Sequence, residues 1–196
     1  GSLLNPRRPA PVRARMTSGY RAFGATMRAM AEAMPEQVIA GGFDTTESVC
    51  LSHLGRDGYR IYLEIFGGGY GASASADGAD GVDSPLSNCS NIPIEAIDMD
   101  YGFFRVLDYS LREGSAGDGR QRGGLGLRRS FRILEDGVTL SSYSDRFTLA
   151  PWPLFGGEPG ASARTRVLRG DDVIEVGAKA SLTLMADDVL ILETGG

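Results

Sequence analysis

Histidine, cysteine and lysine are scarce in this sequence. Its 196 residues include one histidine, His53, two cysteines, Cys50 and Cys89, and one lysine, Lys179. A Ser-His-Asp triad or a multi-histidine metal site would have to use this one imidazole. No neighbour of His53 has ligand spacing, so a structural or surface role is favoured. Two cysteines are too few for a disulfide framework, so we expect reduced thiols in a cytoplasmic protein.

Long apolar runs and an excess of positive charge are also missing. No stretch approaches the ~18 apolar residues of a membrane span, and the lead-in Gly1–Pro9 lacks the apolar core of a signal peptide. The formal net charge of -5 makes nucleic acid an unexpected partner. With 42% hydrophobic and 23% charged residues, the chain resembles an ordinary globular protein of one domain or two small ones.

One amphipathic helix is predicted near the N-terminus. Thr17 or Ser18 offers an N-cap, and Pro35 ends the helical pattern. Apolar residues recur between them every three or four positions, at Tyr20, Phe23, Met27, Met30 and Met34. This spacing places them on one face, which we expect to pack against the core.

The rest of the chain is dominated by predicted strands. The first is Tyr59–Phe66, and from Ile94 onward we expect strands at 102–112, 127–134, 138–142, 164–168, 173–176, 181–185 and 189–193. Glycine-rich turns separate them. The predicted fold is therefore α+β and β-rich, with antiparallel strands in a sandwich or barrel-like unit. We expect a helix-plus-strand segment over 1–110 and a β-rich unit over 111–196, forming one compact piece of a larger assembly.

Glycines cluster in two places. Gly67–Gly71 follows a strand, but neither a dinucleotide fingerprint nor a P-loop is present, so a tight turn at a site or interface is favoured over phosphate binding. Gly114–Gly126 contains Arg120 and Arg122. Guanidinium groups beside exposed backbone N–H groups could grip an anion, and a surface turn with solvated arginines is an equally weighted alternative.

Other polar and aromatic features give no complete catalytic set. Asp77, Asp80 and Asp83 recur every third residue through the loop over 72–81 and just beyond it, and solvated charges are favoured over a weak cation site. A loop of this length is usually functional or mobile. Asp145-Arg146 indicates a local ion pair or turn. The lone Trp152 stands between two prolines, which is typical of a packed aromatic corner.

The order of several motifs resembles the hydantoinase B/oxoprolinase family. Asn88–Glu95 matches an Asn-x-x-Asn-x-Pro-x-Glu segment, and Gly114–Gly126 resembles the family's glycine-rich loop with Arg122 in register. Ser144–Arg146 and the run from Pro151 to Gly160 resemble the next block. The lead-in and Gly67–Gly71 also follow the family order. The resemblance covers essentially the whole chain, but only the C-terminal portion of a family subunit, which is normally more than twice as long.

The resemblance implies one part of an ATP-dependent complex. Such enzymes open cyclic amides such as hydantoins and oxoproline, and a related branch, including acetone and acetophenone carboxylases, carboxylates ketones. An actin-fold A-type partner would bind ATP and magnesium, and an N-terminal B-type chain would supply a divalent metal. No cofactor is expected in this chain. The alternative is a non-catalytic assembly subunit that completes the site of the complex.

One departure from the family pattern concerns the substrate. Where many cyclic-amide members have His-x-His, this sequence has Asp83-Ser84-Pro85, which is compatible with a carboxylase-like branch or with a subunit that does no chemistry. Catalytic residues are not assigned. The candidate substrate- or anion-binding residues are Arg120, Arg122, Gly123 and Gly124. The candidate cavity or interface residues are Gly67, Gly68, Gly69, Tyr70, Asn88, Asn91, Glu95, Asp145 and Arg146.

Overall fold

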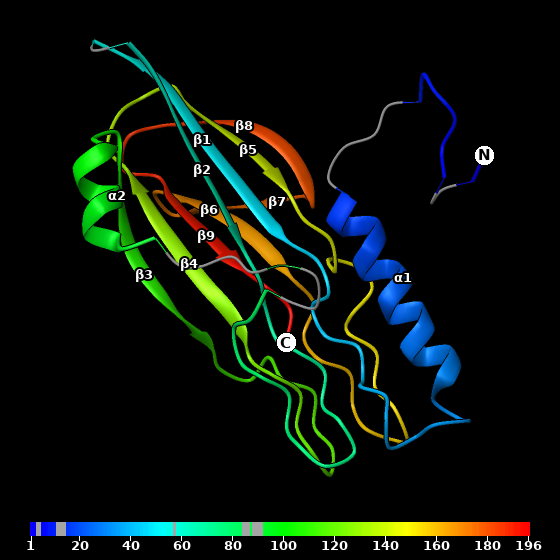
Figure 1. The fold of residues 1–196 in the computed structure, drawn as a ribbon. Coiled ribbons are helices and arrows are strands. Elements are labelled where there is room, and N and C mark those ends of the chain that lie inside the picture. Colours follow the sequence, from blue (N-terminus) through cyan, green and yellow to red (C-terminus); the bar gives the residue numbers. More distant parts are fainter. Residues whose placement is uncertain (3–4, 11–14, 57, 84–86, 88–91) are drawn as a thin grey trace.

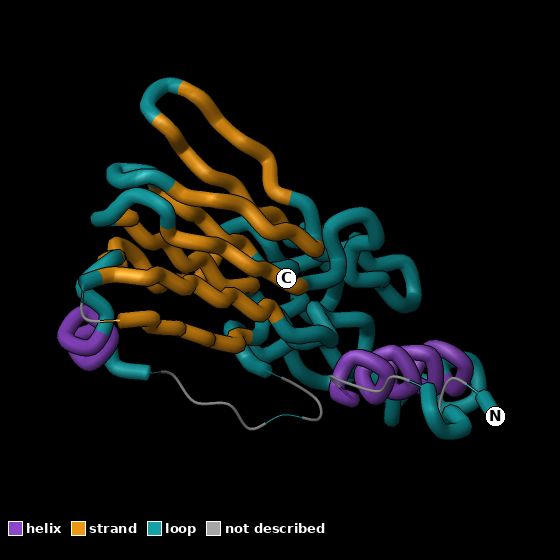
Figure 2. Tube along the Cα trace, turned by 90° about the horizontal axis from the view of Figure 1, so that it is seen from above, coloured by secondary structure: helices purple, strands orange, loops and turns teal. Residues whose placement is uncertain are grey.

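The computed structural model describes residues 1–2, 5–10, 15–56, 58–83, 87 and 92–196. They form two antiparallel β-sheets, with helix α1 (Arg15–Met30) beside one end and α2 (Ile94–Asp100) at the other (Figure 1). The view from above shows α1 lying apart from the strands (Figure 2). The strands are β1 (Glu47–Gly55), β2 (Gly58–Phe66), β3 (Phe104–Arg112), β4 (Gly126–Ile133), β5 (Val138–Tyr143), β6 (Arg164–Arg169), β7 (Asp172–Val176), β8 (Lys179–Leu184) and β9 (Val189–Glu193).

The two sheets form an open sandwich. One has the strand order β2-β1-β5-β8 and the other β3-β4-β9-β6-β7. The first sheet combines strands from both predicted segments, 1–110 and 111–196, because β1 pairs with β2 and also with β5. The predicted β-rich, antiparallel sandwich is therefore confirmed, and its strand positions agree to within a few residues. No helix among the described residues has the length and apolar character needed to cross a membrane.

Two elements were not predicted from the sequence. Strand β1 lies in the interior of its sheet, but two of its four inward positions are the polar residues Glu47 and His53, so its apolar alternation is limited to Val49 and Leu51. Helix α2 occupies 94–100, where we expected strands to begin. It follows Pro93 and buries only Ile97. One buried apolar residue is too few to form the periodic pattern by which a helix is predicted.

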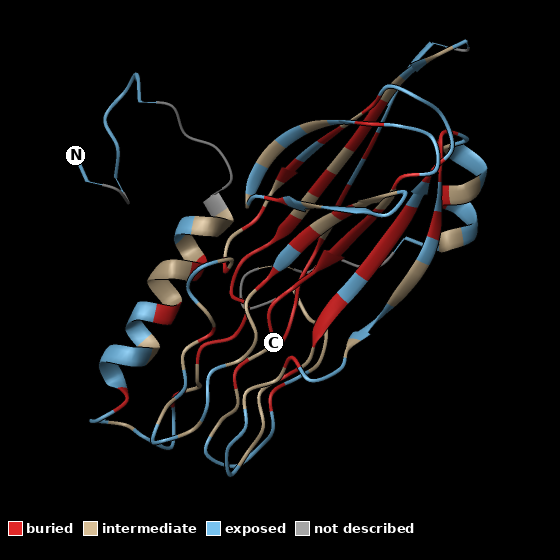
Figure 3. Cartoon of the chain, turned by 180° about the vertical axis from the view of Figure 1, so that it is seen from behind, coloured by how far each residue is buried: buried red, intermediate tan, exposed pale blue. Residues whose placement is uncertain are grey.

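The predicted helix is present, but it starts earlier and ends earlier than expected. It runs from Arg15 to Met30, so Thr17 lies inside it and is not its N-cap. The chain then continues in turns before Pro35, which disfavours helical geometry at the preceding residue. Of the apolar stripe only Tyr20 is buried, and Met30 is exposed, so the expectation of core packing along the whole stripe is wrong. Figure 3 shows most of α1 as intermediate or exposed.

The core lies between the sheets and is rich in aromatic rings. Tyr62 of β2, Phe104 of β3 and Phe131 of β4 are buried in one cluster. The Tyr62 and Phe104 ring centroids are 4.9 Å apart, and those of Phe104 and Phe131 are 5.5 Å apart with nearly perpendicular rings. Edge-to-face contacts of this kind stabilise aromatic clusters beyond simple burial. The Tyr62–Phe104 contact connects a strand of one sheet to a strand of the other.

A buried ion pair also joins the two sheets. Arg129 of β4 is fully buried, and its Nη2 lies 2.9 Å from Oε2 of Glu64 on β2. The Tyr62 hydroxyl donates a hydrogen bond to the same carboxylate, and the guanidinium lies 4.2 Å from the centroid of the Tyr109 ring. Burial is the largest of the effects that raise the pKa of Tyr62, and its bond to Glu64 adds to it. The Tyr62 hydroxyl group therefore stays protonated and remains a hydrogen-bond donor to Glu64.

Removing one member of this pair should be far more harmful than removing both. Arg129→Leu leaves the Glu64 charge buried without a cation, which typically costs about 3–5 kcal/mol of unfolding free energy. The double variant Glu64→Leu/Arg129→Leu should recover most of that loss, because no charge remains buried. Urea unfolding of the three proteins measures both values. Equal destabilisation in the single and double variants would contradict the role given to the pair.

Candidate functional site

The glycine-rich loops gather at one end of the sandwich. Figure 1 shows the segments after β2, before β4 and before β6 side by side at the end nearest α1. Main-chain hydrogen bonds join them: Gly69 N donates to Gly195 O at 2.9 Å, and Gly124 N to Tyr70 O at 2.8 Å. Ala161 N donates to Ser115 O, also at 2.8 Å. Both predicted glycine clusters and the segment after Trp152 thus form one unit, which we call the glycine-loop cluster.

Glycine is required here because main chains approach too closely for a side chain. A Cβ at Gly69 would lie 2.0 Å from the carbonyl oxygen of Gly124, and one at Gly67 would lie 2.1 Å from Val82 O. At Gly68 a Cβ would meet Gly195 O at 2.6 Å. None of these contacts can be relieved by moving a flexible side chain. This supports the tight-turn interpretation of Gly67–Gly71 over a phosphate loop.

Arg122 is held inside this cluster by Asp80. Its two terminal nitrogens lie 2.7 and 3.0 Å from the two carboxylate oxygens of Asp80. Asp77 accepts the Arg122 backbone N–H at 2.9 Å, and Asp83 accepts the Tyr20 hydroxyl at 3.1 Å. The bond to Arg122 holds the pKa of Asp80 below its usual range. The expectation of solvated loop charges therefore fits the exposed Asp77, but it is wrong for Asp80 and Asp83, which are paired. The loop over 72–81 is anchored through Asp80.

Arg146 has a comparable internal role next to the cluster. Its Nη2 lies 3.2 Å from Oδ2 of Asp44, and its Nε donates to Phe43 O at 3.1 Å. Both members of the pair are buried and both have positive φ angles, 45° for Asp44 and 64° for Arg146. The neighbouring Asp145 instead faces Lys179 at 3.5 Å. Neither predicted alternative for Asp145-Arg146 is formed, because the two side chains pair with Lys179 and Asp44 and the residues lie outside any turn. Arg146 braces the loop that precedes β1.

Glu47, the first residue of β1, is a buried carboxyl group. It is 1% exposed, and neither of its oxygens has a hydrogen-bond partner of good geometry among the described residues. Burial raises the pKa of Glu47 to about 8, opposed only by the Ser144 hydroxyl. Thr17 of α1 contacts the hydroxyl of the adjacent Tyr143 at 3.0 Å. With its pKa at about 8, Glu47 is therefore mostly protonated at neutral pH.

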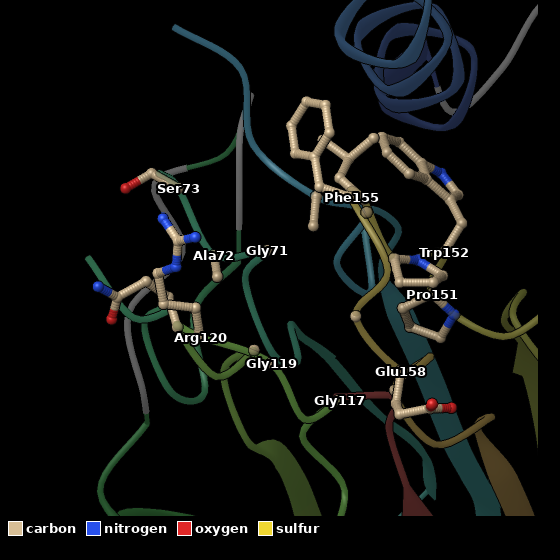
Figure 4. A pocket seen from close by; sticks show the side chains of 18 of the residues that line it. Gly71, Ala72, Ser73, Gly117, Gly119, Arg120, Pro151, Trp152, Phe155 and Glu158 are labelled. Carbon is tan, nitrogen blue, oxygen red and sulfur yellow. The ribbon is translucent and has the colours of Figure 1, made fainter. Parts of the chain in front are cut away.

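A cavity of about 490 Å³ opens between the two predicted glycine clusters and the segment Pro151–Phe155. Figure 4 shows Arg120 beside Ser73 on one side, with Trp152 and Phe155 on the opposite side. Trp152 also packs over Gly41, where a Cβ would lie 2.7 Å from the indole ring. The predicted packing role of Trp152 is thus confirmed, and the same ring lines the cavity.

The cavity combines a guanidinium with several carboxylates. Arg120 is exposed, and its side chain makes no ion pair or hydrogen bond within the part of the chain that the structure describes. Glu36, Asp118 and Glu158 also line the cavity. A ligand would therefore meet an acidic rim, a guanidinium and an aromatic wall. This suits a small flat molecule with both donors and acceptors better than a highly charged anion.

The structure separates the predicted anion-binding residues. Arg120 and Gly123 line the cavity, whereas Arg122 pairs with Asp80 and Gly124 is buried in the loop cluster. The two arginines are thus not a matched pair facing one ligand. Among the described residues no three His, Cys, Asp or Glu side chains stand together as metal ligands.

The remaining predicted residues fall in three places. Gly67, Gly68, Gly69 and Tyr70 belong to the glycine-loop cluster, and Asp145 and Arg146 lie behind it. Glu95 is exposed on α2, at the end of the sandwich opposite the loops (Figure 1). Asn88 and Asn91 lie outside the described residues. No sequence pattern indicated Glu36, Ser73 or the buried Asp44 and Glu47, because their positions depend on distant segments.

Comparison with known proteins identifies what the chain is similar to. A family model described as Hydantoinase B/oxoprolinase matches residues 1–196. A proposed B-type subunit of a D-/L-hydantoinase from Pseudomonas sp. (strain NS671) is 38% identical over 160 residues, which is 82% of this chain and 26% of that protein. A 5-oxoprolinase from Dictyostelium discoideum is 32% identical over 136 residues, 69% of this chain and 11% of that protein. The chain thus spans about a quarter or less of these relatives.

A solved structure shares the fold. The nucleotide-free structure of acetone carboxylase, an enzyme of ATP-dependent acetone carboxylation, superposes with a TM-score of 0.65 at 17% identity. The match covers 89% of this chain and 28% of the acetone carboxylase chain. The sandwich described above therefore also occurs within a much larger polypeptide.

The close contact of main chains at Gly69 gives a testable prediction. Gly69→Ala should unfold the protein or lower its unfolding free energy by more than about 4 kcal/mol, as the worst single substitutions do, because two backbones must separate. Gly177→Ala is the matched control, since a Cβ there meets nothing within 4 Å. Thermal and urea unfolding compare the two variants. A Gly69→Ala protein as stable as the control would show that the loops can part at little cost.

Burial of Glu47 predicts a stability that falls as pH rises. The pKa of this carboxyl group is about 8 in the folded protein and 4.5 for an ordinary glutamate, so the folded state binds the extra proton between these values. Unfolding free energy should therefore decrease from about pH 5 to pH 8. Glu47→Gln should flatten this slope, while the exposed Glu113→Gln should not. Urea unfolding at several pH values measures it, and parallel curves for wild type and Glu47→Gln would contradict the assignment.

Proposed function

The chain belongs to the Hydantoinase B/oxoprolinase family, and we propose that it forms the C-terminal part or small subunit of a B-type enzyme complex. The proposed reaction is ATP-dependent opening of a cyclic amide, such as a hydantoin, oxoproline or another lactam, or carboxylation of a ketone. The observation that carries the proposal is the cavity of about 490 Å³ that the family-matching segments enclose together. We place this complex in the cytoplasm.

The cavity has the chemistry that these substrates need. A cyclic amide presents N–H donors and carbonyl acceptors on a flat ring. The carboxylates of Asp118 and Glu158 could accept the donors, Arg120 could donate to a carbonyl or carboxylate, and Trp152 offers a flat apolar surface. A β-keto acid formed by ketone carboxylation has a carboxylate for the same guanidinium. We propose that this chain binds and orients substrate or intermediate in that cavity.

The nucleotide and metal would be held by partner chains. Within this chain the aspartates of the loop over 72–81 and its flank are already engaged, because Arg122 occupies Asp80 and Tyr20 binds Asp83. We propose an actin-fold A-type partner for ATP and magnesium, and an N-terminal B-type chain for a divalent metal. The structural neighbour acetone carboxylase works in an ATP-dependent reaction, which supports the expectation of a nucleotide-binding partner.

A non-catalytic assembly role is the second candidate. Phe155 is 69% exposed at the cavity rim, and the nearby Leu149 is 76% exposed. Apolar side chains so exposed commonly mark contact with another chain. In this role the glycine-loop cluster would complete a site supplied by partners without binding substrate itself.

The Arg120→Ala variant distinguishes the two roles. If Arg120 contacts substrate, kcat/KM of the assembled complex should fall by about 10- to 100-fold, as expected for a lost charge-assisted hydrogen bond. ATP-dependent turnover of hydantoin, oxoproline and acetone measures the effect. Arg132→Ala, on the outer face of β4, is the matched control and should have no effect.

Assembly must be measured on the same samples. Native mass spectrometry should find the same subunits with Arg120→Ala as with wild type. Unchanged turnover with Arg120→Ala would contradict substrate binding in this cavity and would favour the assembly role. Absence of ATP-dependent turnover in a wild-type complex with every substrate tested would contradict the proposed function.

A further inference from the structure

The outer face of the four-stranded sheet carries an unusual apolar strip at its edge. Leu54, Tyr59, Ile61 and Leu63 are 74%, 63%, 52% and 55% exposed, respectively. We call these four residues the β2 strip. Tyr59, Ile61 and Leu63 alternate along β2, so they share one face of the sheet. Leu54 of β1 lies directly opposite Tyr59 in the pairing register and extends the strip onto the neighbouring strand.

The side chains on the opposite face of β2 are buried. Tyr62, Glu64 and Phe66 point into the core between the sheets. A strand with one face in the core normally presents polar residues to solvent on the other. Strand β2 instead has large apolar side chains on both faces, which is the pattern of a strand covered on both sides.

The strand positions beside the strip are uncharged. Cys50 and Ser52 of β1 oppose Leu63 and Ile61, and Thr139 and Ser141 of β5 continue the same face. The outer face of the five-stranded sheet is a useful contrast within the same molecule. It has the charged residues Arg128, Arg132, Arg164, Arg166 and Glu193, and Arg164 and Arg166 pair with Glu193. Of the two faces, the one on the four-stranded sheet therefore has the surface of an interface.

Among the described residues, no segment pairs with the outer edge of β2. β2 is the outermost strand of its sheet and pairs with β1 without a register shift. Its nine residues include no proline or lysine, and within the described part of the chain its main chain pairs only with β1. Its two charged residues are both engaged, since Glu64 pairs with Arg129 in the core and Arg60 donates to Asp100 O. Free sheet edges are usually blocked by charge, proline or bulges. The β2 edge therefore suits addition of a strand from another segment.

The length of the relatives outside the matched region indicates what could cover the β2 strip. This chain spans 26% of the Pseudomonas hydantoinase protein and 28% of the acetone carboxylase chain, so most of each relative lies outside the matched region. A second copy of this chain is a weaker candidate, because four side chains cover less than the ~800 Å² per partner of a standard stable interface. An occupant held by further contacts can use a smaller patch.

We propose that the β2 strip and the β2 edge dock the remainder of a B-type subunit, through a strand with alternating apolar side chains. The remainder can lie on the same polypeptide or on a separate one. This inference rests on the proposed function, in which the chain is one portion of a larger B-type subunit. It adds the surface through which that portion is joined.

Photo-crosslinking of the complex from its source cells tests the contact. Benzoylphenylalanine replaces Ile61 or Leu63 in two variants, and replaces Arg132 on the charged outer face in a control. After irradiation, mass spectrometry identifies the crosslinked peptides. We expect positions 61 and 63 to crosslink to B-type sequence outside residues 1–196, at least about 10-fold more than position 132.

Three results would overturn the inference. These are crosslinks to a second copy of residues 1–196, crosslinks to an A-type subunit alone, and yields at positions 61 and 63 no higher than at position 132. The double variant Ile61→Lys/Leu63→Lys gives a second measure. It should reduce recovery of the remaining B-type sequence in the native complex, or its protection from protease if the chain is continuous, whereas Arg128→Glu/Arg132→Glu should not. Equal effects of the two double variants would also contradict the proposal.

Turnover of the same preparation separates this inference from the proposed function. An assembly with ATP-dependent turnover but no specific crosslinks would contradict only the docking surface. An assembly with the expected crosslinks but no turnover of any lactam or ketone tested would contradict only the proposed reaction.

Discussion

The structure depends on the close approach of main chains where three glycine-rich segments meet. At Gly69, Gly124 and Gly196 even a methyl group would overlap a carbonyl oxygen of another segment. Hydrogen bonds between those backbones then replace the side-chain packing that glycine cannot provide. Because the segments come from distant parts of the sequence, their contact also fixes the walls of the cavity. The glycines are thus needed for the shape of the site, and their role there does not require a bound phosphate.

Buried or paired arginines support both this cluster and the contact between the sheets. Arg122 fastens the loop over 72–81 through Asp80, Arg146 fastens the segment before β1 through Asp44, and Arg129 joins the two sheets through Glu64. A planar guanidinium with several donors suits each position, since it can bind a carboxylate and a carbonyl or an aromatic face together. These internal roles account for motif arginines that sequence alone would assign to a ligand. Among the described residues that line the cavity, Arg120 is then the cation that faces a ligand.

Local patterns in the sequence were enough to predict most strands, because alternation and turn residues determine them within short windows. The sandwich class followed from the same patterns. The missed β1 and α2 are elements whose burial is set by distant partners: β1 by β2 and β5, and α2 by the core around Ile97. The candidate site was predictable only as a set of loops. Which arginine faces the cavity and which is paired depends on contacts between residues far apart in the chain, such as Arg122 with Asp80.

The two sheet faces show how the chain relates to a larger assembly. A small protein adapted to water on all sides would have charges on both outer faces, as the five-stranded sheet does with its arginines around Glu193. The four-stranded sheet instead has the β2 strip and hydroxyl groups. The core aromatic cluster and the Glu64–Arg129 pair connect β2 rigidly to β4, which leads directly from the glycine-loop cluster. A chain docked at β2 would therefore hold the cavity in a defined position relative to groups that it supplies.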